Sequence, residues 1–120
     1  MNLKPATLVA INRIIATEPQ SDRDLYGYRR LCDLETLYMQ FIEPLKNETQ
    51  DNRNTYSHKS LIKVNKEGQI KNLLETIIDT NSITSIGGDI NETHKYLNEV
   101  LKAENLTFAQ KNNTYIVKKI

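Results

Sequence analysis

The chain has 120 residues, a formal net charge of +1 at pH 7 and one cysteine. This length suits a single domain with its own core, and the charge is far from the strong positive charge typical of nucleic-acid-binding domains. A single cysteine excludes an intrachain disulfide and a cysteine-rich metal site, so we expect a reducing, cytoplasmic location. The only signal-like apolar run, residues 6–11, is too short for a signal peptide or a membrane span, and we expect neither.

The first predicted helix starts at Pro5, because proline suits the first position of a helix. Apolar residues then recur on one face, at Leu8, Ile11 and Ile15. The helix should end before Pro19, since the residue preceding a proline disfavours the helical conformation.

A second, longer helix is predicted from Ser21 to about Glu43. Ser21 followed by Asp24 is similar to a capping box at a helix start, and Pro44 removes a helical amide and stops the helix. Its apolar residues form a stripe that follows steps of three and four: Leu31, Leu34, Tyr38, Phe41 and Leu45. Such a stripe is typical of a helix packed on its own core or of a coiled coil, and the width of the stripe favours the helix packed on its own core.

Residues 46–59 contain one aromatic and no aliphatic side chain, so burial offers little to offset the entropy lost on ordering this segment. We therefore expect a long polar loop there. Residues 61–64 and 83–86 are short apolar or alternating runs that predict two strands. Between them, apolar residues at i, i+3, i+4, i+7 and i+8 predict an amphipathic helix over residues 70–78.

The last predicted helix starts at Asp89. Asp89 and Glu92 have the spacing of a capping box and can accept hydrogen bonds from the free amides of a first helical turn. Leu97 and Leu101 lie on its apolar face. Asn105 suits the left-handed conformation that ends a helix.

A β-hairpin is predicted after this helix, from two apolar runs at residues 106–109 and 115–117. Its register has two alternatives. A two-residue turn pairs Phe108 with Val117, whereas a three-residue turn pairs Phe108 with Ile116. The two alternatives bury opposite faces of the hairpin.

Together these elements predict a single α+β domain over residues 1–120. Two helices occupy residues 1–45, a polar loop occupies residues 46–59, and an α+β part occupies residues 60–120. In that last part we expect a small sheet, made of the short strands and the C-terminal hairpin, packed against two amphipathic helices.

One short motif suggests a chemistry. Arg53 is followed by the polar Asn54 and, four residues beyond, by His58. This pattern resembles the active-site motif of HEPN-type ribonucleases, and the resemblance covers residues 53–58. It implies that Arg53 and His58 of paired helices face each other across a dimer and cleave RNA, with proton transfer and charge stabilisation at the phosphate.

The C-terminal hairpin suggests a second nucleic-acid hypothesis. A helix followed by a two-stranded wing resembles the end of a winged-helix domain. That resemblance implies contacts with nucleic acid through Lys111, Lys118 and Lys119 of the wing.

The sequence contains no nucleophile elbow, phosphate loop or nucleotide fingerprint, and its two histidines predict no metal site. We therefore expect no cofactor and favour a non-enzymatic protein–protein interaction or assembly domain. Its partner would be another protein or a second copy of the chain. The candidate partner-binding residues are the aromatic end of the stripe, Tyr38, Phe41 and Leu45.

Overall fold

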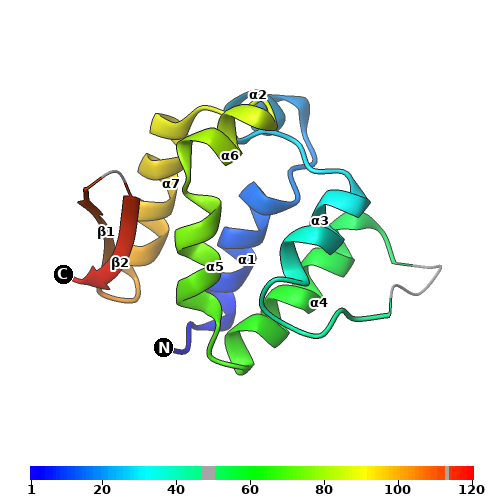
Figure 1. Cartoon of the computed structure of the whole chain (residues 1–120), viewed down its shortest axis with the longest axis horizontal. Helices are drawn as coiled ribbons and strands as arrows, with labels where there is room; N and C mark the ends of the chain where they lie inside the picture. The colour runs from blue at the N-terminus through cyan, green and yellow to red at the C-terminus, as the bar shows by residue number, and fades with distance from the viewer. Residues whose placement is uncertain (47–50, 113) are drawn as a thin grey trace.

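The computed structural model describes residues 1–46, 51–112 and 114–120. Within these residues, seven helices precede a two-stranded antiparallel sheet (Figure 1), which confirms the α+β class. None of the described helices combines the length and the apolar character needed to cross a membrane. The elements are α1 (Pro5–Ile15), α2 (Gln20–Tyr26), α3 (Leu31–Tyr38), α4 (Arg53–Lys66), α5 (Ile70–Ile77), α6 (Thr80–Ser85), α7 (Ile90–Lys102), β1 (Leu106–Lys111) and β2 (Thr114–Lys119).

The core forms around α1, which starts at Pro5 as predicted and contacts α2, α4 and α7. Ile11 and Ile15, on its predicted apolar face, have no exposed surface. The hairpin lies at one side of the molecule against α7 and α5, and α3 and α4 lie at the other (Figure 1). Helix α1 therefore connects the two halves of the core.

Helix α7 matches its prediction at both ends. One Asp89 carboxylate oxygen accepts hydrogen bonds from the backbone N–H groups of Asn91 and Glu92, at 2.8 and 3.2 Å. Asn105 follows the helix with φ of 56°, in the left-handed region. Leu97 and Leu101 are fully buried, so the predicted apolar face is confirmed.

The hairpin has the register of the two-residue turn, in which Phe108 pairs with Val117. Asn112 has φ of 57°, as the first residue of such a turn requires, and residue 113 lies outside the described residues. Leu106, Phe108 and Val117 are buried on the face that meets the helices.

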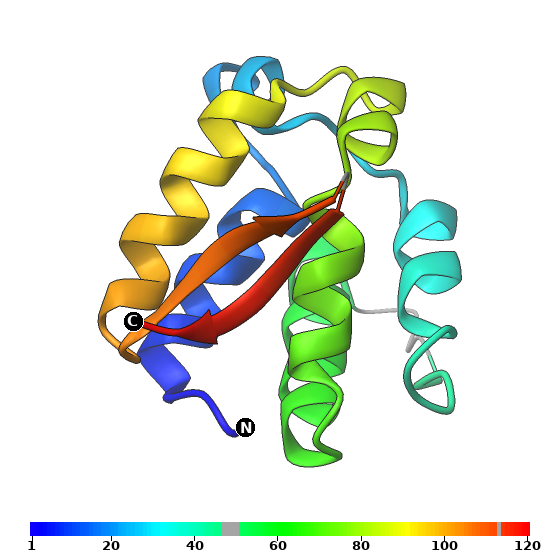
Figure 2. The same cartoon turned by 60° about the vertical axis from the view of Figure 1, so that its left-hand side comes forward.

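Helix side chains cover both edges of this hairpin. The Asn98 side-chain oxygen of α7 accepts a hydrogen bond from the Phe108 N–H at 2.9 Å. The Glu75 carboxylate of α5 accepts one from the Val117 N–H at 2.7 Å. Figure 2 shows the hairpin lying across α5 and α7. The central outward-facing N–H of each strand is therefore bonded within the chain.

The prediction of one helix from residue 21 to residue 43 is wrong, because Gly27 separates α2 from α3. Gly27 has φ of 87°, and a Cβ there would lie 2.5 Å from Ile86 Cγ1. The Tyr28 N–H donates to the Ile86 carbonyl at 3.0 Å, and the Asp89 N–H donates to the Leu25 carbonyl at 2.8 Å. The helix is thus interrupted where the backbone of residues 25–28 packs closely against residues 86–89, and glycine at position 27 allows this close approach.

The prediction of a polar loop over residues 46–59 is also wrong in its second half, and residues 47–50 lie outside the described residues. Helix α4 begins at Arg53, and the Asn52 side chain caps it by accepting a hydrogen bond from the Thr55 N–H at 2.8 Å. The strand predicted at residues 61–64 belongs to this same helix.

The strand predicted at residues 83–86 is instead the end of α6. The Asp79 side chain caps that helix by accepting a hydrogen bond from the Ser82 N–H at 3.0 Å. Within the described residues, the sheet therefore consists of the hairpin alone.

Candidate functional site

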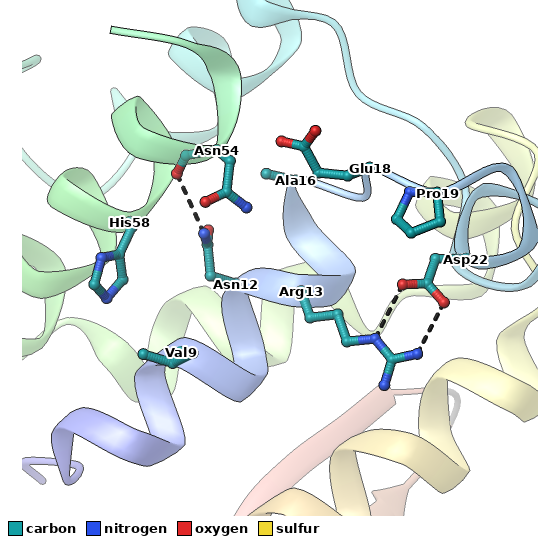
Figure 3. A pocket seen from close by; sticks show the side chains of 9 residues that line it. All are labelled: Val9, Asn12, Arg13, Ala16, Glu18, Pro19, Asp22, Asn54 and His58. Atoms are coloured by element: carbon teal, nitrogen blue, oxygen red, sulfur yellow. Dashed lines mark hydrogen bonds and ion pairs between the residues drawn. The ribbon is translucent and has the colours of Figure 1, made fainter.

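A hollow of about 230 Å³ lies between α1, the start of α2 and α4. It contains His58, the histidine of the sequence motif, among polar side chains from three segments (Figure 3). Its lining residues are Val9, Asn12, Arg13, Ala16, Glu18, Pro19, Asp22, Asn54 and His58.

A chain of hydrogen bonds runs from this hollow into the core. Asn12 donates through Nδ2 to the Asn54 carbonyl at 3.3 Å and accepts at Oδ1 from Ser57 Oγ at 2.6 Å. Because the Ser57 hydrogen is used there, the Tyr38 hydroxyl donates to Ser57 Oγ, at 2.7 Å. Burial raises the pKa of Tyr38 above its ordinary value, so the phenol stays protonated and the chain of donors is complete.

Arg13 and Asp22 form a two-pronged ion pair at one end of the hollow (Figure 3), with N–O distances of 3.0 and 2.9 Å. Asp22 raises the pKa of the Arg13 guanidinium. The guanidinium also lies over the Tyr96 ring, 5.5 Å from its centroid. Arg13 therefore joins α1 to α2 and α7.

Arg53 and His58 both lie on α4, which corrects the loop placement expected from the sequence. Their surroundings differ, because residues five apart on a helix are separated by about 140° around its axis. Arg53 donates through Nε to the Arg29 carbonyl at 2.8 Å and through both terminal nitrogens to the Thr17 carbonyl at 3.3 Å. Its guanidinium also stacks over the Tyr28 ring at 4.4 Å. Arg53 thus fastens the start of α4 to two loops and does not line the hollow with His58.

His58 lies at the opposite end of the hollow from the Arg13–Asp22 pair (Figure 3). It is half-buried and forms no hydrogen bond to another described residue. An imidazole in this position can transfer a proton to a bound molecule. Glu18 is the lining carboxylate outside the ion pair.

The predicted partner-binding stripe is divided between core and surface. Tyr38 is fully buried, with its ring packed edge-on against that of Tyr56. It therefore cannot contact a partner in this conformation. Phe41 and Leu45 follow α3 and are half-buried against the core.

The three hairpin lysines are exposed but spread out. Lys111 pairs with Thr114 near the turn, whereas Lys118 and Lys119 pair with residues at the far end of β1. Successive strand residues point to opposite faces, so Lys118 and Lys119 diverge. Lys111 and Lys118 share a face, but four residues of strand separate them by roughly 14 Å.

A larger apolar surface lies beside the first hollow, along α1 and α4. Two hollows of about 450 and 570 Å³ share Ile62 and Lys66 as lining residues, and we refer to them together as the α1–α4 groove. Val9 exposes 57% and Ile62 45% of its surface there. The groove is lined by Asn2, Leu3, Pro5, Leu8, Val9, Leu45, His58, Lys59, Ile62, Lys63, Asn65, Lys66 and Glu67.

Sequence reasoning missed this groove because both of its apolar ridges are inconspicuous locally. Val9 and Leu8 are adjacent aliphatic residues of α1, but Leu8 is buried whereas Val9 is exposed. The sequence alone does not distinguish these two environments. Ile62 falls in the run that was predicted to be a strand. A helical assignment of residues 53–66 would have placed Ile62 on the polar face with His58 and Lys66, where a large aliphatic side chain is unusual.

No family model, curated protein or solved structure significantly matches this chain. In the part of the chain that the structure describes, no cluster of three or more histidine, cysteine or acidic side chains is arranged to bind a metal ion.

Proposed function

We propose that this domain is a protein-interaction module that binds an amphipathic segment of a partner protein in the α1–α4 groove. The observation that carries the proposal is the exposure of two large aliphatic side chains, Val9 and Ile62, on either side of a hollow. Exposed aliphatic side chains beside a hollow of this kind suit the apolar face of a helix.

The charges around the groove define the chemistry of the segment. Lys59, Lys63 and Lys66 line it together with one acid, Glu67. Lys59 also pairs with Asp51 at 3.2 Å, so the excess positive charge lies mainly at the other two lysines. We infer that the partner segment carries acidic residues beside its apolar anchors, because opposite charges across an interface favour encounter and orientation.

Two synthetic peptides test this proposal. Both have the same helical pattern of leucines, one with glutamates and the other with lysines on its polar face. In NMR titrations, we expect the glutamate peptide to shift the amide signals around Val9 and Ile62 and the lysine peptide to shift none. Ile62→Asp should weaken binding at least about tenfold, since it removes a side chain worth roughly 1.5 kcal/mol and buries a charge.

Met39→Asp is the matched control, because Met39 is 60% exposed and lies outside the groove. Sedimentation across a range of concentrations tests whether a second copy of the chain, rather than a partner segment, occupies the groove. A dimer that Ile62→Asp abolishes and Met39→Asp preserves would mean that a second copy fills the groove. A strict monomer whose amide signals neither peptide shifts would refute the proposal.

The single exposed thiol, Cys32, suits a reducing compartment, and we include a cytoplasmic location in the proposal.

Cleavage of RNA is a second candidate function, favoured by the position of Arg53 and His58 in the first two turns of one helix. It requires that Arg53 exchange its carbonyl acceptors for a phosphate. Incubation of single-stranded RNA with the protein, Arg53→Ala and His58→Ala tests it. Cleavage that both substitutions abolish would establish the ribonuclease, and an intact RNA at every protein concentration would exclude it.

A further inference from the structure

Arg29 is a buried cation on the connection between α2 and α3. It exposes only 7% of its surface. Burial lowers the pKa of its guanidinium to about 10, so the group still carries its charge at neutral pH. Removing a charge from water is unfavourable unless polar groups or an opposite charge replace the lost hydration.

The described residues replace that hydration only in part. Nη1 of Arg29 donates to the carbonyls of Ile14 and Ile15 at 3.5 and 3.4 Å, two long contacts at the last turn of α1. The negative end of that helix favours a cation there. Nε and Nη2 have no hydrogen-bond acceptor, and no carboxylate is ion-paired with Arg29, among the residues that the structure describes.

Arg29 lines a hollow of about 320 Å³ that is separate from the α1–α4 groove and shares no lining residue with it. The hollow lies among α3, α5 and α6, which are cyan, green and yellow-green in Figure 2. Its volume is at the lower end of the range for small-molecule sites. The uncharged polar side chains around it are Thr36, Gln40, Thr76, Ser82 and Ser85.

Most of these hydroxyl groups now donate to the backbone of their own segment. Thr36, Thr76 and Ser85 donate to carbonyls at 2.8–2.9 Å. A hydroxyl hydrogen rotates about its C–O bond, so each can donate to a molecule in the hollow instead. The hollow therefore combines one cation with several adjustable donors.

One acid also lines the hollow. Asp33 accepts hydrogen bonds from the Arg30 backbone N–H at 2.8 Å and from Arg30 Nε at 3.2 Å. Arg30 lowers the pKa of this carboxyl, and the pair largely neutralises itself. The net charge around the hollow is therefore positive, because no carboxylate is paired with Arg29 among the described residues.

We propose that the hollow around Arg29 is a binding site for a small phosphate-class oxyanion, either inorganic phosphate or the phosphate group of a small ligand. The planar guanidinium can donate two parallel hydrogen bonds to two oxygens of one phosphate. The remaining oxygens can accept from Thr76 and Ser85, whereas the Ser82 hydroxyl donates to the Asp79 carboxylate at 3.1 Å. A carboxylate has two oxygens and uses fewer of these donors, so the tetrahedral anion fits the donor set better.

The test is an NMR titration of the whole chain with sodium phosphate, against sodium chloride of equal ionic strength. We expect saturable shifts of the amides of Arg29, Thr76 and Ser85. A simple phosphate monoester and acetate are titrated in parallel. Equal binding of phosphate and monoester identifies the free ion as sufficient, whereas binding of the monoester alone identifies a phosphorylated small molecule. Acetate binding as tight as that of phosphate would overturn the assignment to phosphate.

Two substitutions complete the test. Arg29→Met should weaken phosphate binding at least about tenfold, because a charge-assisted hydrogen-bonded pair is lost. Ser85→Trp fills the hollow from an exposed position and should abolish phosphate binding. This variant still tests the site if Arg29→Met fails to fold. Ile62→Asp, in the α1–α4 groove, should bind phosphate like the unchanged protein. Absence of saturable shifts with phosphate and monoester, or unchanged binding by Ser85→Trp, would refute the site.

Discussion

The buried chain Tyr38–Ser57–Asn12 gives the sharpest prediction about stability. Ser57 Oγ accepts from Tyr38 and donates to Asn12, so Ser57→Ala leaves two buried groups without partners. Tyr38 is fully buried and Asn12 is 4% exposed, so water does not readily replace the lost hydroxyl. Each unsatisfied buried group lowers stability by roughly 1–3 kcal/mol, so we expect a loss of about 2–6 kcal/mol from the two groups.

Tyr38→Phe should have different effects on stability in the unchanged protein and in the Ser57→Ala variant. Alone, it removes one donor while Ser57 keeps its bond to Asn12, and the loss should be about 1 kcal/mol. Added to Ser57→Ala, it removes a hydroxyl that has no acceptor. The double variant should therefore be at least as stable as Ser57→Ala.

Urea unfolding of the four proteins in a double-mutant cycle measures this coupling. Ser85→Ala is the control, because Ser85 is exposed and donates only within its own helix. It should change the free energy of unfolding by less than about 0.5 kcal/mol. An equal loss from Tyr38→Phe in both backgrounds would show that the three side chains do not act as one chain.

Three further outcomes concern other parts of the fold. Leu97→Ala should lower the free energy of unfolding by roughly 2–5 kcal/mol, whereas Lys95→Ala on the exposed face should be nearly silent; equal melting-temperature losses would contradict the assigned face. Asp89→Ala should lower it by about 1 kcal/mol through the lost cap, as urea unfolding can measure. Unfolded tyrosines ionise near pH 10 while burial keeps Tyr38 protonated, so stability should fall by up to about 1.4 kcal/mol per pH unit above pH 10 on account of this residue, and less steeply in Tyr38→Phe.

The elements that were predicted correctly are those whose signals are local. Asp89 and Asn105 mark both ends of α7 by side-chain and backbone preferences that act within one turn. The hairpin itself was also predicted from local residue preferences, whereas its register was left between two alternatives until the structure showed the two-residue turn at Asn112. In each case the deciding interaction lies within a few residues of the signal.

Helix α4 was missed because its buried face is partly polar. Ser57 and Ser60 are fully buried there, and Ser57 is satisfied by side chains 19 and 45 residues away in the sequence. A pattern of apolar residues cannot mark a face that is buried through such distant bonds. The burial of Arg29, and with it the candidate anion site, is hidden from the sequence for the same reason.

The two covered edges of the hairpin affect how copies of this chain can associate. A third strand that approached β1 or β2 would find the central donor already bonded, to Asn98 on one edge and to Glu75 on the other. Displacing the Glu75 carboxylate would sacrifice a charge-assisted bond worth roughly 1.5–3 kcal/mol. Crowded copies should therefore associate through their helical surfaces, and the hairpin should resist the strand-to-strand addition that leads to fibrils.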